Sequence, residues 1–181
     1  YVGFLTAFFI IIGSLSYIFF IPIIEKKNKI KLYFNILALF TISYLLFGLF
    51  TNLYSVIILG IIVSILASLG ITCSGIIVRD KTRDSSVSKN EGIISTSRNI
   101  AFLLGPIIAG FIANRYGITN VFFFAAITMF ISLNLLKLME IKDNRVKKRV
   151  DKSSIKVFID FFRKRERTLS YITSGGITFW W

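Results

Sequence analysis

Histidine is absent from this sequence, and cysteine occurs only once, at Cys73 inside an apolar stretch. A disulfide needs two cysteines, and the usual zinc and transition-metal sites are built largely from cysteine and histidine side chains. We therefore expect no disulfide framework and no metal site, and no sequence pattern indicates a cofactor.

Acidic residues are also scarce. Nine Asp and Glu stand against 22 Lys and Arg, which gives a net charge of +13. None of the nine lies inside a long apolar run, so the chain lacks the carboxylates and histidines that an intramembrane enzyme needs for acid–base or metal chemistry. A basic balance can indicate nucleic-acid binding. Here the charges are confined to blocks between uncharged runs, and we expect no nucleic-acid partner.

Long apolar runs, by contrast, are abundant. Hydrophobic residues make up 55% of the 181 residues and the mean hydropathy is +0.74, whereas soluble domains are roughly 45–50% apolar. A helix needs about 20 apolar residues to cross a bilayer. Residues 32–78 carry no charge over about twice that length, so the chain must turn within them, most suitably at Thr51-Asn52. The predicted spans are residues 1–24, 32–50, 54–78, 92–114 and 119–136.

Two of these spans, residues 32–50 and 119–136, are rich in aromatic side chains. Such bulk is typical of helices that face lipid, and we expect both to do so. Their aromatic residues include Phe40, Tyr44, Phe47, Phe123 and Phe130.

Residues 54–78 differ, because Ser64, Ser68 and Thr72 recur there at four-residue spacing and share one helical face. A bundle has little reason to present hydroxyl groups to lipid. We expect an interior helix or one lining a wet cavity, and these three residues are candidates for a substrate path.

Small residues recur every fourth position in the span at residues 92–114. They are Ala101, Gly105, Ala109 and Ala113. Such a face lets another helix approach closely, which is a main source of helix association in membranes. Pro106 lacks an N–H and crowds the preceding turn, which predicts a kink.

The basic residues predict the orientation. Of the 22 Lys and Arg, 21 lie in residues 25–31, 79–98 and 137–167, on one side of the predicted bundle, and Arg115 lies on the other. Short basic loops mark the cytoplasmic face. We expect this face to contact anionic lipid headgroups of the plasma membrane.

Residues 137–167 read as a basic cytoplasmic linker. Within it, Ile155, Phe158, Ile159 and Phe162 form an apolar helical stripe, which predicts a short amphipathic helix at the membrane interface. Residues 168–181 are apolar but too few to cross, so we expect the start of a further span. The chain opens without Met inside an apolar run, and we interpret it as a fragment of a longer protein.

The fourth span carries a recognisable motif. Its residues resemble the G-x8-G-x3-G-P-x2-G-G motif in the fifth transmembrane helix of major facilitator superfamily transporters, where the motif marks antiporter branches, although two glycines are alanines here. The matching residues are Gly92, Ala101, Gly105, Pro106, Ala109 and Gly110. The order of spans, loops and linker resembles helices two to six of that family, the central linker and the start of helix seven.

The first basic loop adds to the resemblance. Residues 25–29, Glu-Lys-Lys-Asn-Lys, are similar to the D-R-x-G-R loop between helices two and three of the family. In the family this loop forms a charge network with the cytoplasmic end of helix four, which latches the transporter facing outward. The resemblance therefore implies a cytoplasmic gate. Its candidate residues are Glu25, Lys26, Lys29, Arg79 and Asp80.

One charge, Arg98, is set inside a predicted span, beside Asn99. Charged residues within spans are costly and usually face a cavity or a partner, so both residues are candidates for binding an anionic group or for gating. Snorkelling of Arg98 to the near cytoplasmic surface is the alternative.

We thus expect an all-α integral membrane protein with five full transmembrane helices and part of a sixth. The family resemblance implies a secondary transporter that moves a small solute by alternating access, possible solutes being drugs or metabolites for efflux. Its first helix and its C-terminal half would lie outside this chain. The alternative is a polytopic assembly or structural subunit that transports nothing, since small-residue faces serve assembly equally well.

Overall fold

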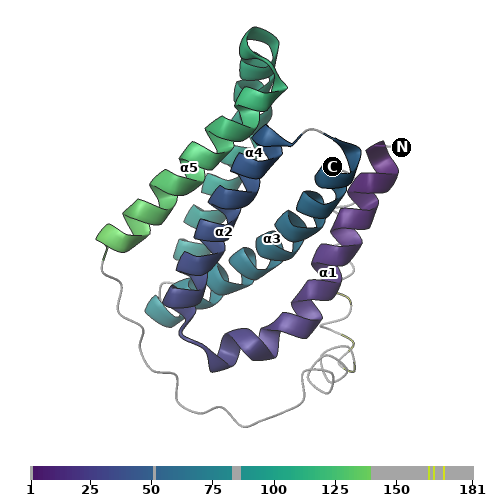
Figure 1. Cartoon of the computed structure of the whole chain (residues 1–181). Helices are drawn as coiled ribbons and strands as arrows, with labels where there is room; N and C mark the ends of the chain where they lie inside the picture. The colour runs from purple at the N-terminus through teal and green to yellow at the C-terminus, as the bar shows by residue number, and fades with distance from the viewer. Residues whose placement is uncertain are drawn as a thin grey trace. The chain divides into compact units, whose positions relative to one another are not determined.

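The computed structural model describes residues 2–50, 52–82 and 87–139, together with positions 163, 165 and 169. Its elements run in antiparallel succession (Figure 1). They are α1 (Val2–Lys26), α2 (Lys29–Leu49), α3 (Leu53–Lys81), α4 (Val87–Tyr116) and α5 (Ile118–Leu138). No strand occurs among the described residues, so the predicted all-α fold is confirmed.

Four helices are long and apolar enough to cross a membrane: α2, α3, α5 and the Lys89–Tyr116 part of α4. The helix α1 has 25 residues, and its described apolar part covers Gly3–Ser16. The architecture is therefore that of a polytopic helical membrane protein.

The chain turns where its polar pair predicts. Helix α2 ends at Leu49 and α3 begins at Leu53, with Asn52 as its N-cap. The Asn52 side chain accepts a hydrogen bond of 2.8 Å from the Ser55 backbone N–H, and Asn28 accepts one of the same length from Lys31 at the start of α2. Each asparagine thus pairs a backbone donor that the first helical turn leaves unsatisfied.

The polar stretch at residues 79–91, expected to be a loop, is helical at most of its described positions. Arg79, Asp80 and Lys81 continue α3, and α4 starts at Val87, before the predicted start of its apolar run. The reason is physical: hydropathy marks the segment that lies in lipid, whereas the backbone hydrogen bonds of a helix continue into water.

Helix α2 is the centre of the arrangement. It packs against α3 on one side and α5 on another, while α1 packs on α3 and α4 packs on α5 (Figure 1). The buried cluster lies where the first three helices meet. Its members are Ile24, Ile36, Phe40, Leu66 and Cys73.

This central position makes one expectation wrong, because α2 does not simply face lipid. Phe40 and Phe47 are each 8% exposed, and the Phe47 ring stacks on Phe122 of α5 at 5.1 Å between centroids. For α5 the expectation holds in part, since Phe130 is exposed. The aromatic rings of α2 fill contacts between helices.

Three other expectations are tested only in part by the described residues. Pro106 lies inside α4, which continues through it, and the kink stays a prediction. The linker at 137–167 begins within α5, because that helix includes Lys137 and ends at Leu138. The amphipathic helix with its stripe at 155–162 and the apolar segment 168–181 lie outside the described residues, apart from Arg163, Arg165 and Leu169.

Candidate functional site

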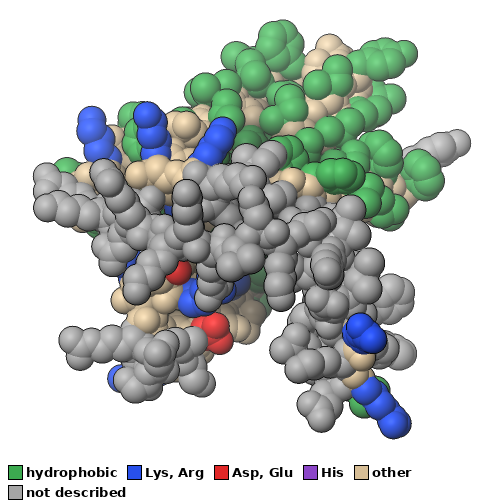
Figure 2. Space-filling model, turned by 90° about the horizontal axis from the view of Figure 1, so that it is seen from below, with side chains coloured by type: hydrophobic (Ala, Val, Ile, Leu, Met, Phe, Trp, Pro, Cys, Tyr) green, Lys and Arg blue, Asp and Glu red, His purple; other side chains and the backbone are tan. Residues whose placement is uncertain are grey.

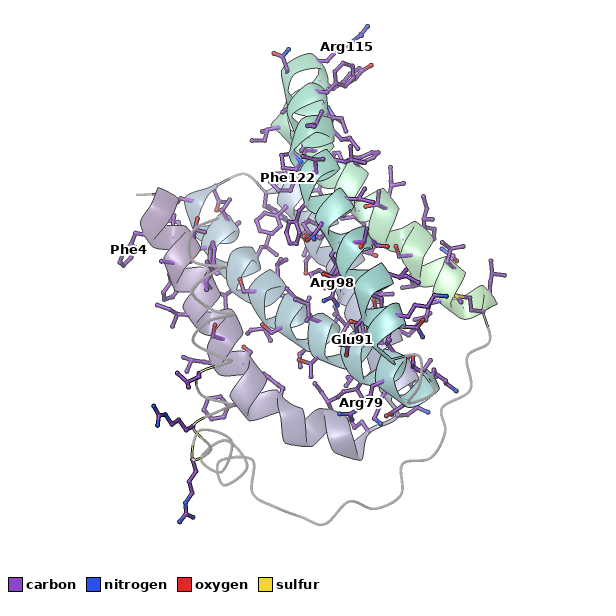
Figure 3. The ribbon with its side chains drawn as sticks, turned by 180° about the vertical axis from the view of Figure 1, so that it is seen from behind. Phe4, Arg79, Glu91, Arg98, Arg115 and Phe122 are labelled. Carbon is purple, nitrogen blue, oxygen red and sulfur yellow. The ribbon has the colours of Figure 1, made fainter. Side chains whose placement is uncertain are left out.

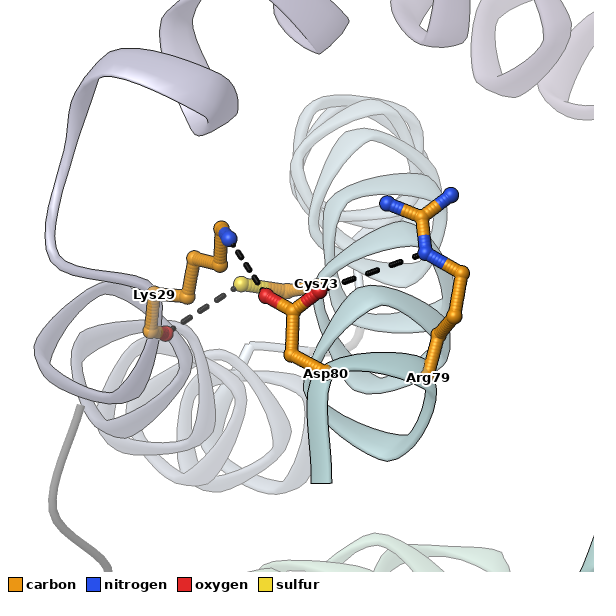
Figure 4. A network of polar contacts seen from close by, with 4 residues as sticks. All are labelled: Lys29, Cys73, Arg79 and Asp80. Atoms are coloured by element: carbon orange, nitrogen blue, oxygen red, sulfur yellow. Dashed lines mark hydrogen bonds and ion pairs between the residues drawn. The ribbon is translucent and has the colours of Figure 1, made fainter. Parts of the chain in front are cut away.

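Lys29 and Asp80 form an ion pair between two helices. Lys29 is the first residue of α2, and Asp80 lies in the last turn of α3. Lys29 Nζ donates to Asp80 Oδ2 at 2.6 Å, with the lysine side chain 5% exposed and the aspartate 34% (Figure 4). An ammonium group held away from water needs such a partner, so the pair ties the start of α2 to the end of α3.

Cys73 binds the same lysine at a second point. Its Sγ donates to the Lys29 carbonyl oxygen at 3.3 Å, and the side chain is fully buried. Cys73 and Asp80 are seven residues apart, two helical turns, and so share one face of α3. Sequence reasoning did not single out Cys73 for this site, although its spacing from Asp80 was a usable signal.

Arg79 contributes little to this pair. Its Nε lies 4.0 Å from Asp80 Oδ1 and its side chain is 60% exposed. Such exposed contacts are worth little because water and salt screen them. Glu25 and Lys26 belong to the end of α1, but their side chains are outside the described set. The structure therefore unites three of the five gate candidates, Lys29, Arg79 and Asp80, while their gating role stays a prediction.

The hydroxyl face of α3 is used within and between helices. Ser68 Oγ lies 2.8 Å from the Gly13 carbonyl oxygen of α1 and 3.0 Å from the Ser64 carbonyl oxygen, and Ser68 is buried. Ser64 and Thr72 donate to carbonyl oxygens of their own helix, at 2.8 and 2.9 Å. Ser68 thus serves the α1–α3 contact, whereas Ser64 and Thr72 remain half-buried.

Arg98 and Asn99 are exposed on α4. Arg98 lies between Glu91 and Arg115 along this helix (Figure 3). The structure does not bring Arg98 together with the hydroxyl face of α3 in any hydrogen bond among the described residues.

The small-residue face of α4 is open at its glycine, Gly105. A Cβ built at Gly92, Gly105 or Gly110 finds no atom within 4 Å. Ala101 and Pro106 are exposed, and Ala109 is half-buried. Among the described residues, no helix packs closely beside Gly105, so the close contact that this face predicts stays a prediction there.

Charged side chains gather at one end of the bundle, shown from below in Figure 2. The exposed basic residues come from the α1–α2 turn, the end of α3, the start of α4 and the end of α5. They are Lys27, Lys31, Arg79, Lys81, Lys89 and Lys137. Arg115 lies at the opposite end, in the last turn of α4 (Figure 3). The helix arrangement thus keeps the charge asymmetry of the sequence.

A comparison with protein families gives a match over the whole chain. The family described as Major Facilitator Superfamily matches residues 1–181. No curated protein and no solved structure matches the chain. Because the family match covers every residue, and the helical membrane architecture agrees with it, the chain belongs to the Major Facilitator Superfamily.

Proposed function

We propose that this chain forms helices two to six of a secondary transporter, which moves a small solute across the plasma membrane by alternating access. Family membership supports a transporter. In such proteins two bundles rock about a site near the middle of the membrane. We propose that a first helix and a C-terminal half outside this chain complete the solute path, and the motif in α4 favours efflux of a drug or metabolite.

The Lys29–Asp80 pair carries this proposal. It joins two helices at the basic end of the bundle, where the superfamily resemblance places a latch, and the lysine is almost fully buried. Removing one partner of a buried pair is costly because the other charge is left in a poor environment. We propose that this pair holds one of the two orientations of the transporter and breaks when the bundles rock.

The basic end of the bundle is proposed to face the cytoplasm. Lys27, Lys31, Lys81 and Lys137 are exposed there, and Arg115 lies at the other end. The positive-inside rule assigns such an end to the cytoplasmic leaflet, where lysines attract anionic headgroups.

Charge reversal tests the latch in the complete reading frame. Lys29→Asp and Asp80→Lys should each abolish efflux of amphipathic dyes from a host lacking its own exporters, since each places two like charges together. The double exchange restores opposite charges and should recover part of the efflux. Lys31→Gln is the matched control, because it removes an exposed charge from the same end of the bundle and its side chain is not part of the pair. Normal efflux by folded Lys29→Asp would contradict the latch.

A second candidate, a polytopic assembly subunit that transports nothing, is favoured by one observation, the open small-residue face of α4. Such a face suits assembly with another helix. The same efflux measurement separates the two, because an assembly subunit transports no member of a broad panel of small solutes and instead copurifies with a partner of fixed stoichiometry.

A further inference from the structure

Lys29 is held by α3 at two of its groups. Its ammonium meets Asp80 at 2.6 Å, and its main-chain carbonyl accepts from Cys73 at 3.3 Å (Figure 4). The first contact fixes the end of a long, flexible side chain, and the second fixes the backbone from which that side chain starts.

The second contact lies in the dry interior. Cys73 has no exposed surface, and it belongs to the buried cluster with Ile24 of α1 and Ile36 of α2. The ion pair lies at the outer edge of this cluster, since the Asp80 side chain is 34% exposed. Water or a reagent can therefore reach Cys73 only after the helices that cover it separate, and the start of α2 is one of them.

We infer that Cys73 is a positioning residue of the latch. This inference rests on the proposed latch function of Lys29 and Asp80. The Cys73 thiol fixes the first residue of α2 against α3, so the lysine ammonium is already placed when it meets the carboxylate. A lysine side chain loses much rotamer freedom when it is ordered. A fixed backbone reduces the number of conformations that the ammonium group can adopt before it meets the carboxylate. The two contacts must form and break together.

The reactivity of the Cys73 thiol tests whether its hydrogen bond to Lys29 is coupled to the Lys29–Asp80 pair. The complete protein, with any other cysteine replaced, is treated in membranes with N-ethylmaleimide, and modification of Cys73 is followed by intact-protein mass spectrometry. We expect wild-type Cys73 to react slowly against a denatured sample. Asp80→Asn should raise the rate about tenfold or more, the change produced by about 1.4 kcal/mol of weaker closure. The matched control, Lys31→Gln, should stay within about twofold of wild type because Lys31 is exposed and its side chain is not part of the Lys29–Asp80 pair.

Two results would overturn the inference. One is an unchanged rate in Asp80→Asn, and the other is an equal rise in Lys31→Gln, which would show a general loosening of the basic end. Because labelling needs no transported solute, its outcome is independent of whether efflux is found. Conversely, working efflux with an unchanged labelling rate would remove Cys73 from the latch and leave the transporter proposal standing.

A double-mutant cycle provides a readout that simple packing would not move. If Cys73→Ala and Asp80→Asn both act through Lys29, their effects on Tm in detergent should be non-additive. The double variant should lose clearly less Tm than the two single losses together. Cys73→Ser keeps a hydrogen-bond donor to the carbonyl and should retain most of the wild-type Tm. Additive losses, or equal losses for Ser and Ala, would assign Cys73 to packing alone.

Discussion

The ring of Phe123 on α5 fills the space beside Gly48 on α2. A Cβ at position 48 would lie 2.7 Å from one ring carbon and 3.0 Å from two others. Beside it, the ring of Phe47 stacks on Phe122 of α5, with the centroids 5.1 Å apart. Glycine at this position therefore sets how closely the two helices approach.

Replacing Gly48 with alanine should lower the stability of the α2–α5 contact. The added methyl group forces the ring or the helices apart, and such overpacking typically costs about 1–3 kcal/mol. Thermal unfolding of the purified protein in detergent measures the loss. Gly75→Ala is the control, since its Cβ would meet no atom within 4 Å and alanine favours a helix. A drop in Tm for Gly75→Ala as large as for Gly48→Ala would contradict the explanation.

Ser68 should matter more than its neighbours on the same face. In Ser68→Ala the carbonyl of Gly13 loses a donor from the other helix, whereas in Ser64→Ala only a bond within α3 disappears. Interhelical hydrogen bonds in membranes average about 0.6 kcal/mol and reach about 1.7. We expect Ser68→Ala to lower Tm and Ser64→Ala to leave it nearly unchanged. Equal Tm values for the two variants would show that the contact to Gly13 contributes nothing.

Residue patterns predicted the number and order of helices well. The uncharged run at 32–78 is too long for one crossing, so a turn within it could be predicted. Asn52 lies at that turn and caps the start of α3. The ends of the helices were harder to predict. Helix α4, for example, begins at Val87 in a polar stretch, where hydropathy does not mark a helix start.

Which face of a helix is buried was much harder to predict. Lipid and protein interior are equally apolar, so Phe40 and Phe47, both buried between helices, look like lipid-facing residues in sequence. Lys29 and Asp80 were expected together only through the family motif, and the Cys73 contact depends on a carbonyl that no side-chain pattern records.

Surface labelling tests the orientation. Lys27→Cys and Tyr116→Cys place thiols at exposed positions at opposite ends of the bundle. With the basic end in the cytoplasm, a membrane-impermeant maleimide should label position 116 in intact cells and position 27 only in inside-out vesicles. Labelling of position 27 in intact cells would reverse the proposed topology.

The open face of α4 predicts a distinctive result for Gly105→Leu. No described atom lies within 4 Å of a Cβ at this position, so the described bundle itself should tolerate leucine. If the face packs on a helix outside the described residues, leucine should hold the two apart and block transport. Gly105→Ala, which keeps the face small, serves as the control. Unimpaired efflux by Gly105→Leu would show that no helix packs closely there.

Arg98 tests whether α4 lines the solute path. It lies six residues after Gly92, where the sequence predicts that the span begins, which is about 9 Å along the helix axis. Arg98→Lys keeps the charge but loses the planar fork that binds carboxylate or phosphate at two points. If Arg98 binds an anionic solute, this exchange should reduce uptake of that solute into proteoliposomes about tenfold or more, since charge-assisted hydrogen bonds are worth about 1.5–3 kcal/mol.

The control is Lys89→Gln, which removes an exposed charge near the start of α4 and should leave uptake nearly unchanged. Full uptake by Arg98→Lys would assign Arg98 to the membrane surface, and the anion-binding group would then have to lie on another helix.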